Sequence, residues 1–479
     1  MALTHSVSAG HHSFLLDGRW IEGEPREIRS PFDQQVIATV GYAGRSDAES
    51  AIAAAERAFA TTRRLPAYER QRALRAIAQG LSERREEFAA VLAREAGKPI
   101  KAARVEIDRA VFTFHIAAEE ATRIYGDVLP LDLQPAATGR WAILRRFPLG
   151  PIAAITPFNF PVNLAAHKIA PAIAAGCTIV LKPPPQDPIA TLMLAEVVRE
   201  AGLPDGAVNV LPLDNEDADP LVTDERIKML TFTGSGAVGW QLRQRAGKKR
   251  VTLELGGNAA VIVHGDADVR FAADRCVAGG FSYAGQSCIS VQRIYVQRAA
   301  QESFLDALVA ATRKLKVGDP MDDTTDVGPM IREADARRAE EWIDEAVKGG
   351  ATVLCGGHRT GALLEPTVLT RTRPEMRVNC AEVFAPVVTV EPYDDFEDAL
   401  RRVNDSPYGL QAGLFTRDAK LIFHAYEELQ VGGVIVGDIP SWRIDHMPYG
   451  GVKESGTGRE GLRYSIEEMT ERKLLVMNV

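Results

Sequence analysis

The chain has few cysteines and no pattern that would link them. Five cysteines occur in 479 residues, and no two of them form a Cys-x-x-Cys pair. An odd number without paired spacing argues against a disulfide framework and a zinc ribbon. We therefore expect a reducing, cytoplasmic location. Four of the thiols are expected to serve only as small buried side chains.

Long hydrophobic runs and an excess of basic charge are also missing. The longest apolar stretch, residues 169–181, is interrupted by Pro171 and Gly176 and is too short to span a bilayer. The N-terminal residues lack the basic start and apolar core of a signal peptide, so we expect none. With 56 basic and 64 acidic residues, the formal charge is −8, which gives no footprint for nucleic acid. We expect neither a membrane nor nucleic acid as a partner, and no bound metal.

Short apolar runs that alternate with helical patterns dominate the chain from residue 151 onward. The first series predicts strands at 151–155, 178–182, 208–211, 229–231 and 251–255, with helices at 162–175, 189–201 and from 234. The second predicts strands at 260–263, 352–354, 387–390 and 433–436, with helices at 300–314, 332–347 and 396–403. This alternation is typical of βαβ units with parallel strands. We therefore predict an α/β fold with two domains and a cleft between them.

The first 150 residues follow a different pattern. Helical spacing predicts long helices at 66–95 and 101–125, and Ser46 with Glu49 matches a capping box at the start of an earlier helix. The stretch from Gly126 to Trp141 interrupts the alternation. Together with a C-terminal strand at 472–479 it is a candidate for an arm that pairs with another subunit, because an open strand edge favours association.

A glycine-rich turn follows one predicted strand and opens a helix. Gly234-Ser-Gly-Ala-Val-Gly239 matches the dinucleotide pattern GxGxxG, and Glu254 lies 20 residues after its first glycine. In that pattern Glu254 would bind the ribose hydroxyls. Turns of this length also occur without a ligand, so the turn alone does not decide the function.

Further motifs around this turn carry a resemblance. In chain order they are Pro157-Phe-Asn-Phe-Pro161, Leu181-Lys-Pro183, Phe232-Thr-Gly-Ser-Gly236, Leu253-Glu-Leu-Gly-Gly-Asn258, Gly285-Gln-Ser-Cys288, Glu382-Val-Phe384 and Pro448-Tyr-Gly-Gly-Val-Lys453. As an ordered set they resemble the aldehyde dehydrogenase superfamily over nearly the whole chain. The resemblance implies two Rossmann-like α/β domains with a small β arm.

The resemblance implies four catalytic residues. Cys288 matches the nucleophile that attacks the aldehyde, and Asn159 matches the amide that stabilises the oxyanion with the Cys288 N–H group. Glu254 matches the general base for thioester hydrolysis, which replaces its interpretation as a ribose ligand. Lys168 resembles a lysine of the proton relay, with an ordinary solvated helix lysine as the alternative.

The resemblance also implies NAD or NADP as the cofactor. Lys182 and Glu382 match the residues that contact the two riboses, Ser235 lies at the helix N-terminus near the pyrophosphate, and Phe384 packs near the nicotinamide. The implied cofactor-binding positions are Thr156, Pro157, Phe158, Lys182, Pro183, Pro185, Gly234, Ser235, Gly239, Leu255, Gly256, Glu382 and Phe384. Pro185 stands where NAD-specific members commonly carry a Glu. The absence of that carboxylate makes NADP admissible.

The implied substrate pocket has two arginines. Its positions are Arg109, Phe160, His167, Ser287, Arg443 and Tyr449, of which Phe160 and Tyr449 would be apolar walls. Arg109 and Arg443 would suit an anionic aldehyde, although each could instead form a surface ion pair. His167 could equally be a core histidine. The segment Asn163–Lys168 resembles a branch with lactaldehyde, glyceraldehyde and phosphonoacetaldehyde enzymes and succinic-semialdehyde-like members, which favours small polar or anionic aldehydes.

The resemblance divides the chain into three units. Residues 1–125 and 148–255 would bind NAD(P), residues 256–446 would form the catalytic domain, and residues 126–147 and 467–479 the arm of a homodimer or homotetramer. The alternatives are a CoA-acylating member, a non-catalytic structural member and a cofactor-free cysteine hydrolase or acyltransferase. The presence of Glu254, of Cys288 and of Lys182, respectively, argues against them.

Overall fold

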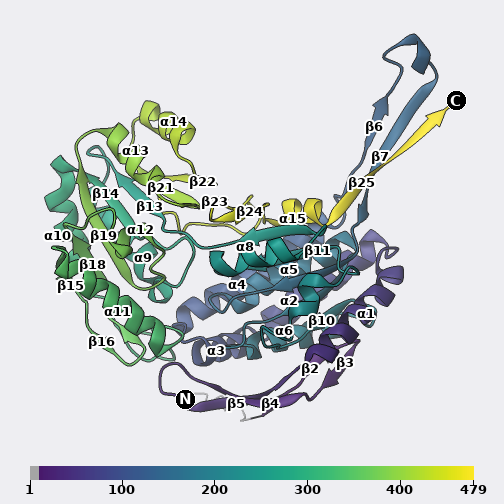
Figure 1. Ribbon diagram of the computed structural model, residues 1–479, viewed down its shortest axis with the longest axis horizontal. Coiled ribbons are helices and arrows are strands. Elements are labelled where there is room, and N and C mark those ends of the chain that lie inside the picture. The colour runs from purple at the N-terminus through teal and green to yellow at the C-terminus, as the bar shows by residue number, and fades with distance from the viewer. Residues whose placement is uncertain (1–9) are drawn as a thin grey trace.

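Two large sheets, each covered by helices, a projecting three-stranded arm and three smaller sheets make up the described part of the protein (Figure 1). The computed structural model describes residues 10–479. The absence of a signal peptide was inferred from residues that lie largely outside this range. Among the described residues, no helix is long and apolar enough to cross a membrane.

The first large sheet has a parallel centre. Its strand order is β24-β12-β11-β8-β9-β10-β2-β3, and the pairs from β12 to β10 are parallel. The strands are β8 (Pro151–Ile155), β9 (Thr178–Lys182), β10 (Val208–Val210), β11 (Met229–Thr233), β12 (Arg250–Glu254) and the antiparallel edges β2 (Phe14–Leu16), β3 (Arg19–Ile21) and β24 (Gly456–Thr457). The chain runs from β8 to one side and returns to β11 on the other. The switch point between β8 and β11 is where open α/β sheets bind ligands, at the carboxyl ends of the strands.

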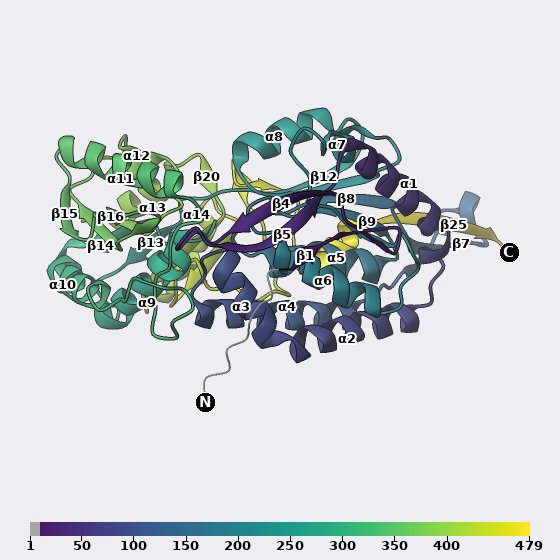
Figure 2. The same ribbon diagram turned by 90° about the horizontal axis from the view of Figure 1, so that it is seen from below.

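Helices cover both faces of this sheet (Figure 2). One layer contains α2 (Ala67–Glu83), α3 (Arg85–Glu95), α4 (Ile100–Glu120), α5 (Pro161–Ala175) and α6 (Ile189–Glu200). The other contains α1 (Arg45–Thr62), α7 (Asp219–Thr223) and α8 (Gly236–Arg245). Every residue of α5 is buried, since α2 and α4 pack over it and the sheet lies beneath it. Most of its residues are apolar, as expected for a helix buried on every side, and the exceptions are Asn163, His167 and Lys168.

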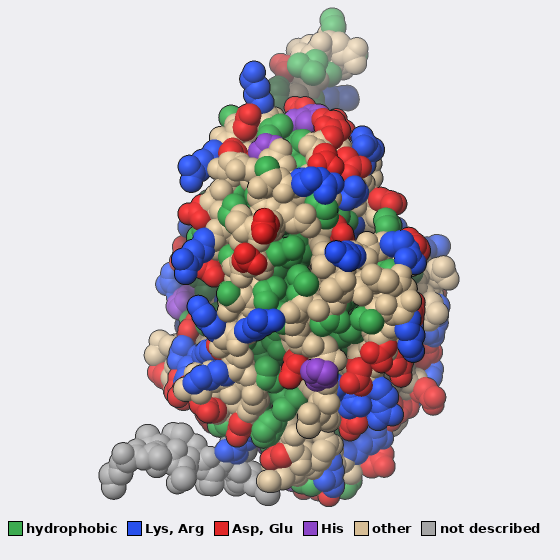
Figure 3. All heavy atoms as spheres, turned by 90° about the vertical axis from the view of Figure 1, so that its left-hand side faces the viewer, with side chains coloured by type: hydrophobic (Ala, Val, Ile, Leu, Met, Phe, Trp, Pro, Cys, Tyr) green, Lys and Arg blue, Asp and Glu red, His purple; other side chains and the backbone are tan. Residues whose placement is uncertain are grey.

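The second large sheet has the order β15-β18-β19-β14-β13-β21-β22. Its strands are β13 (Ala260–Val263), β14 (Arg293–Gln297), β15 (Thr352–Cys355), β18 (Thr367–Thr370), β19 (Val387–Tyr393), β21 (Gln411–Phe415) and β22 (Gly433–Val436), all parallel except β15. Its principal helices are α9 (Val269–Phe281), α10 (Gln301–Thr312), α11 (Glu333–Lys348), α13 (Phe396–Asn404) and α14 (Ala419–Glu428). On the face drawn in Figure 3, basic and acidic side chains are interspersed, so neither sign dominates that face.

Two segments that are distant in the sequence pair with each other in the arm. Strand β7 (Arg140–Pro148) lies between β6 (Asp127–Pro130) and the C-terminal β25 (Thr470–Asn478). The β25–β7 register runs from Thr470 opposite Pro148 to Asn478 opposite Arg140. The arm projects from the body (Figure 1) and leaves Leu474, Leu475 and Val476 exposed.

Three local predictions are wrong. The pattern at 66–95 is two helices, because the chain breaks at Arg84 between α2 and α3. The next long helix ends at Glu120 rather than 125. Helix α1 begins one residue before Ser46, with Gly44 as its N-cap, and the Asp47 carboxylate accepts the Gly44 N–H at 2.9 Å. Asp47 therefore has the role in the capping box that the sequence pattern predicted for Glu49.

Candidate active site

A cavity of about 710 Å³ lies where the carboxyl ends of β8, β11 and β12 face the loop after α9. It brings together most of the predicted site. Its lining includes Arg109, Pro157, Phe158, Asn159, Phe160, Gly234, Ser235, Glu254, Leu255, Gly256, Ser287, Cys288, Glu382, Phe384, Arg443 and Tyr449. The remaining predicted residues do not line this cavity; they are Thr156, His167, Lys168, Lys182, Pro183, Pro185 and Gly239. The described residues contain no cluster of three metal-ligating side chains.

Cys288 is presented by a tight reversal after α9. Tyr283 and Ala284 have φ of 49° and 52°, and Gly285 follows with φ of 67°. A Cβ on Gly285 would lie 2.1 Å from the Ala385 carbonyl oxygen, so only glycine fits. Burial raises the pKa of the Cys288 thiol to about 11, against a hydrogen bond with Tyr449 that lowers it. The thiol is therefore protonated at neutral pH in this state.

Asn159 lies just beyond β8, and a buried ion pair holds its backbone. Lys98 Nζ donates to the Asn159 carbonyl oxygen at 2.7 Å and forms an ion pair with Glu106. The other Glu106 oxygen accepts the N–H groups of Val162 and Asn163 at 3.0 and 3.1 Å, at the start of α5. This leaves the Asn159 side chain on the cavity wall, where Nδ2 donates to the Gln286 carbonyl at 3.1 Å. The sequence motifs did not identify Lys98 or Glu106.

Glu254 ends β12 as a buried carboxyl group without hydrogen bonds. Its side chain lines the cavity, and neither oxygen has a partner among the described residues. Burial, and then the charge of Glu460, raise its pKa well above the ordinary value. A Cβ on Gly450 would lie 2.9 Å from Glu254 Oε1, so a glycine allows the chain to approach this closely. This carboxyl group therefore keeps its proton at a pH where an exposed glutamate is ionised.

Lys168 is not a solvated helix lysine. It is 1% exposed and forms an ion pair with Glu460. Burial opposes the charge of Glu460, but Lys168, His167 and Arg443 hold its pKa below the ordinary value. The charge of Lys168 also acts to lower the pKa of Glu254. Lys168 and Glu460 thus form a fixed charge pair beside Glu254, and Glu460 was not among the predicted residues.

Several of the predicted cofactor-binding residues lie at the switch point of the first sheet, where they favour the binding of an anion. Ser235 is the N-cap of α8, whose first-turn N–H groups favour an anion. A Cβ on Gly239 would lie 2.4 Å from the Leu255 side chain, so glycine lets this helix pack closely on the sheet. At the end of β9, Lys182 is buried, and burial lowers its pKa to about 8.

Glu382 and the rings of Phe158 and Phe384 form the opposite side of this predicted cofactor site. Glu382 accepts the Gly257 N–H at 2.9 Å, and burial raises its pKa to about 7. Gly256 leaves the space it needs, because a Cβ there would lie 2.1 Å from Glu382 Oε2. Phe158 and Phe384 meet edge to face at 6.0 Å. These groups fit a dinucleotide, because Lys182 and the N-terminus of α8 suit its phosphates and the Glu382 carboxylate suits its ribose hydroxyls.

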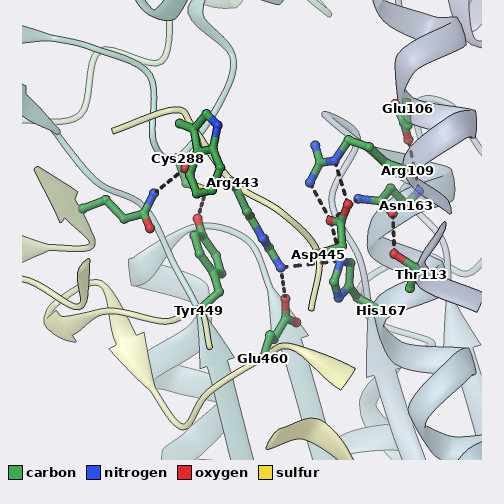
Figure 4. Close-up of polar contacts among 12 residues, drawn as sticks. Glu106, Arg109, Thr113, Asn163, His167, Cys288, Arg443, Asp445, Tyr449 and Glu460 are labelled. Atoms are coloured by element: carbon green, nitrogen blue, oxygen red, sulfur yellow. Dashed lines mark hydrogen bonds and ion pairs between the residues drawn. The ribbon is translucent and has the colours of Figure 1, made fainter. Parts of the chain in front are cut away.

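Asp445 organises the far end of the cavity (Figure 4). Its carboxylate receives both Nε and Nη2 of Arg109, at 3.0 and 2.7 Å, and lies 2.9 Å from His167 Nε2. Asn163 Nδ2 donates to the same carboxylate at 3.1 Å. Burial opposes its charge, but the hydrogen bonds from His167 and Arg109 hold the pKa of Asp445 well below the ordinary value. The charge of Arg109 is thus neutralised by the buried Asp445 and not by a carboxylate on the surface.

Arg443 is the second arginine of this wall (Figure 4), and its side chain is 7% exposed, against 27% for Arg109. Its Nη2 lies 3.7 Å from Glu460 Oε2, and Glu460 is already paired with Lys168. Its Nε has no hydrogen-bond partner among residues 10–479. Burial opposes the charge, yet Tyr449, Glu460 and Asp445 raise the pKa of Arg443. Arg443 therefore keeps a positive charge that faces the cavity.

The model of the Aldehyde dehydrogenase family matches residues 20–475. The chain belongs to the aldehyde dehydrogenase family. It is 46% identical over 479 residues to 3-sulfolactaldehyde dehydrogenase from Priestia aryabhattai, covering 100% of both chains. This family membership makes the protein an NAD(P)-dependent enzyme that oxidises an aldehyde to the carboxylic acid.

Solved structures of this family share the fold closely. Aldehyde dehydrogenase 21 from Physcomitrella patens, in complex with the reaction product succinate, has a TM-score of 0.97 at 43% identity, over 98% of this chain and 99% of that one. The glyceraldehyde-3-phosphate dehydrogenase GapN from Methanocaldococcus jannaschii, complexed with NADP, has a TM-score of 0.92 at 38% identity, over 96% and 100% of the two chains. The predicted fold class is confirmed.

Proposed function

We propose that this aldehyde dehydrogenase oxidises a small aldehyde that carries an anionic group, and that Arg443 binds that group. The supporting observation is the buried guanidinium of Arg443 on the same cavity wall as Cys288. An exposed arginine would gain little from such a ligand, whereas a desolvated one binds a carboxylate or sulfonate strongly. Arg109 contributes less positive charge, because Asp445 occupies two of its nitrogen atoms.

The names of the relatives agree with this substrate class. One acts on a sulfonated hydroxyaldehyde, 3-sulfolactaldehyde, and another was solved with the dicarboxylate succinate. Both molecules place an anionic group a few atoms from the reacting carbon. We therefore assign short sulfonated or carboxylated aldehydes as the substrates of this chain.

The reaction would begin at Cys288. Its thiolate attacks the aldehyde carbon, and the developing oxyanion receives hydrogen bonds from Asn159 Nδ2 and the Cys288 N–H group. The bound NAD(P)⁺, held by Lys182, Ser235 and Glu382, supplies the hydride acceptor for oxidation to the thioester. Glu254 then takes a proton from the water that attacks the thioester, and Cys288 leaves as the thiolate.

Lys168 would help Glu254 to work as a base. A neutral Glu254 must lose its proton before it can accept one from water. The ammonium of Lys168 favours the ionised form of Glu254, and the Glu460 carboxylate opposes it. The effect of Glu460 is the larger of the two, so the pKa of Glu254 stays well above its ordinary value.

Either cofactor form is proposed to be accepted. Pro185 carries no charge that would repel a 2′-phosphate, and Tyr42 Oη donates to its carbonyl oxygen at 2.7 Å, which fixes the loop. The nearby Asp214 is paired with Arg26 at 2.8 Å. The 2′-phosphate of NADP would therefore lie near Lys182, and no carboxylate at position 185 would repel it.

The same proposal includes the assembly. Residues 1–125 and 148–255 would bind NAD(P), 256–446 would supply the catalytic cysteine, and 126–147 with 467–479 would pair two subunits into a dimer or tetramer. The exposed Leu474, Leu475 and Val476 on β25 support an interface there. A cytoplasmic location is part of this proposal.

The test compares an anionic aldehyde with a neutral one. The kcat/KM of wild type and Arg443→Leu is measured with succinic semialdehyde and with propanal, using NADP⁺. Loss of a charge-assisted contact of about 1.5–3 kcal/mol predicts a fall that is roughly 10- to 100-fold larger for succinic semialdehyde than for propanal. Arg401→Leu, at an exposed position on α13, is the control. Equal losses on both aldehydes would remove Arg443 as the anion site.

A further inference from the structure

A hydroxyl group lies against the sulfur atom of Cys288, in a wall that the sequence predicted to be apolar. Tyr449 Oη is 3.0 Å from Cys288 Sγ (Figure 4). The tyrosine is 3% exposed. Its N–H donates to the Glu460 carbonyl at 3.1 Å, and the Glu460 N–H donates back to the Tyr449 carbonyl at 2.7 Å. Backbone pairing therefore holds the backbone of Tyr449 in place, and burial restricts the ring that carries the hydroxyl.

A cation covers the ring that carries this hydroxyl. The Arg443 guanidinium carbon lies 3.7 Å from the centre of the Tyr449 ring. A cation over a phenol ring draws electron density from it, which makes the O–H group a stronger donor. The same positive charge also favours a negative charge on the nearby sulfur.

We propose that Tyr449 is a catalytic residue whose hydroxyl donates a hydrogen bond to the Cys288 thiolate. This inference rests on the proposed role of Cys288 as the nucleophile. When the thiol ionises, the S–H bond breaks and the proton leaves for water, directly or through Glu254. Tyr449 keeps its own proton and turns it toward the sulfur. In the neutral pair either atom can donate, but once the sulfur is an anion only the phenol can.

The pKa shifts of the two groups agree with donation from the Tyr449 hydroxyl to the Cys288 sulfur. Burial holds the pKa of Tyr449 well above its ordinary value, so the phenol stays protonated. Burial also raises the pKa of the Cys288 thiol, and the Tyr449 hydrogen bond and then the Arg443 charge counteract it. A phenylalanine would keep the apolar wall and lose only this stabilisation.

The test is the pH dependence of alkylation by iodoacetamide, which is neutral and needs neither cofactor nor aldehyde. The rate is measured between pH 6 and 10.5 for wild type, Tyr449→Phe and the control Tyr426→Phe, whose tyrosine is 70% exposed on α14. This range lies below the pKa of the thiol, so a change in that pKa appears as a ratio of the rates at each pH. We expect Tyr449→Phe to raise the pKa of the thiol by about one unit and to slow alkylation about tenfold at pH 7.5. The control should match wild type.

Three further outcomes test the inference and separate it from the proposed function. Arg443→Leu keeps Tyr449 and should raise the pKa of the thiol in the same direction; an unchanged value would remove Arg443 from this role. An unchanged or lowered pKa in Tyr449→Phe would mean that the thiol donates to the phenol, and would overturn the inference. If wild type keeps its dehydrogenase activity after complete alkylation of Cys288, the proposed function fails instead.

Discussion

Replacement of Glu254 by glutamine should stop the enzyme after its first half-reaction. The glutamine has the same shape but cannot take a proton from water. General-base catalysis contributes roughly 10²- to 10⁴-fold in rate, which corresponds to about 2.7–5.4 kcal/mol of activation free energy. We expect the steady-state rate of Glu254→Gln to fall by that factor, while the acylation of Cys288 continues.

Because of the surroundings of Glu254, its replacement by glutamine should remove the base without disturbing neighbouring residues. Neither carboxyl oxygen has a hydrogen-bond partner among the described residues, so the change breaks no hydrogen bond there. The raised pKa means that the folded state keeps a proton that the unfolded chain releases above about pH 4.3. Folding is therefore penalised as the pH rises through that value. Glutamine removes the penalty, and the variant should melt no lower than wild type at pH 7.

Stopped-flow absorbance of reduced cofactor is the assay. With excess succinic semialdehyde and NADP⁺, Glu254→Gln should give a burst that approaches one equivalent per site, followed by a slow steady state. The result that would refute the reasoning is a large rise in the KM for the cofactor with normal turnover. Glu254 would then be a ribose ligand, as the glycine-rich turn alone suggests.

The remaining predictions concern residues around the cavity and the arm. Asp445→Asn removes the charge that neutralises Arg109 and orients His167; we expect a melting temperature several degrees lower, measured by calorimetry. Pro185→Glu should weaken NADP⁺ at least tenfold while NAD⁺ is little changed, as titration of each cofactor would show. Leu475→Lys on the arm should shift the mass measured by light scattering toward the monomer, and an unchanged mass would place the interface elsewhere.

The pH dependence follows from Glu254 in the wild-type enzyme. Hydrolysis of the thioester needs the ionised carboxylate, and its pKa is raised, so single-turnover deacylation should accelerate as the pH rises through the neutral range. Lys168→Met removes a charge that lowers this pKa, and should displace the profile to higher pH. A flat profile between pH 6 and 9 would exclude a carboxylate base.

Strand pattern and ordered motifs were sufficient for the fold and for most of the cavity lining. The parallel strands were predictable because buried strands in such sheets are continuous apolar runs, as in β8 and β9. Motifs located Cys288, Asn159 and Glu254, because each belongs to a short segment that ends at the cavity.

What the sequence did not predict depends on contacts between distant segments. Glu460 is 292 residues from Lys168, and Asp445 is 336 residues from Arg109. In the sequence both carboxylates lie among other polar residues, and only the fold buries them. The hydroxyl of Tyr449 was missed for a related reason: the residue type fits an apolar wall, and its contact with sulfur depends on the path of the chain after Arg443.

The location of the covalent intermediate tests the central claim most directly. Glu254→Gln is mixed with NADP⁺ and succinic semialdehyde, quenched in acid, digested and mapped by mass spectrometry. A covalent succinyl group on the peptide that contains Cys288, and on no other cysteine peptide, is the predicted result. An acyl group on another cysteine such as Cys380, or none during a full burst, would contradict the account.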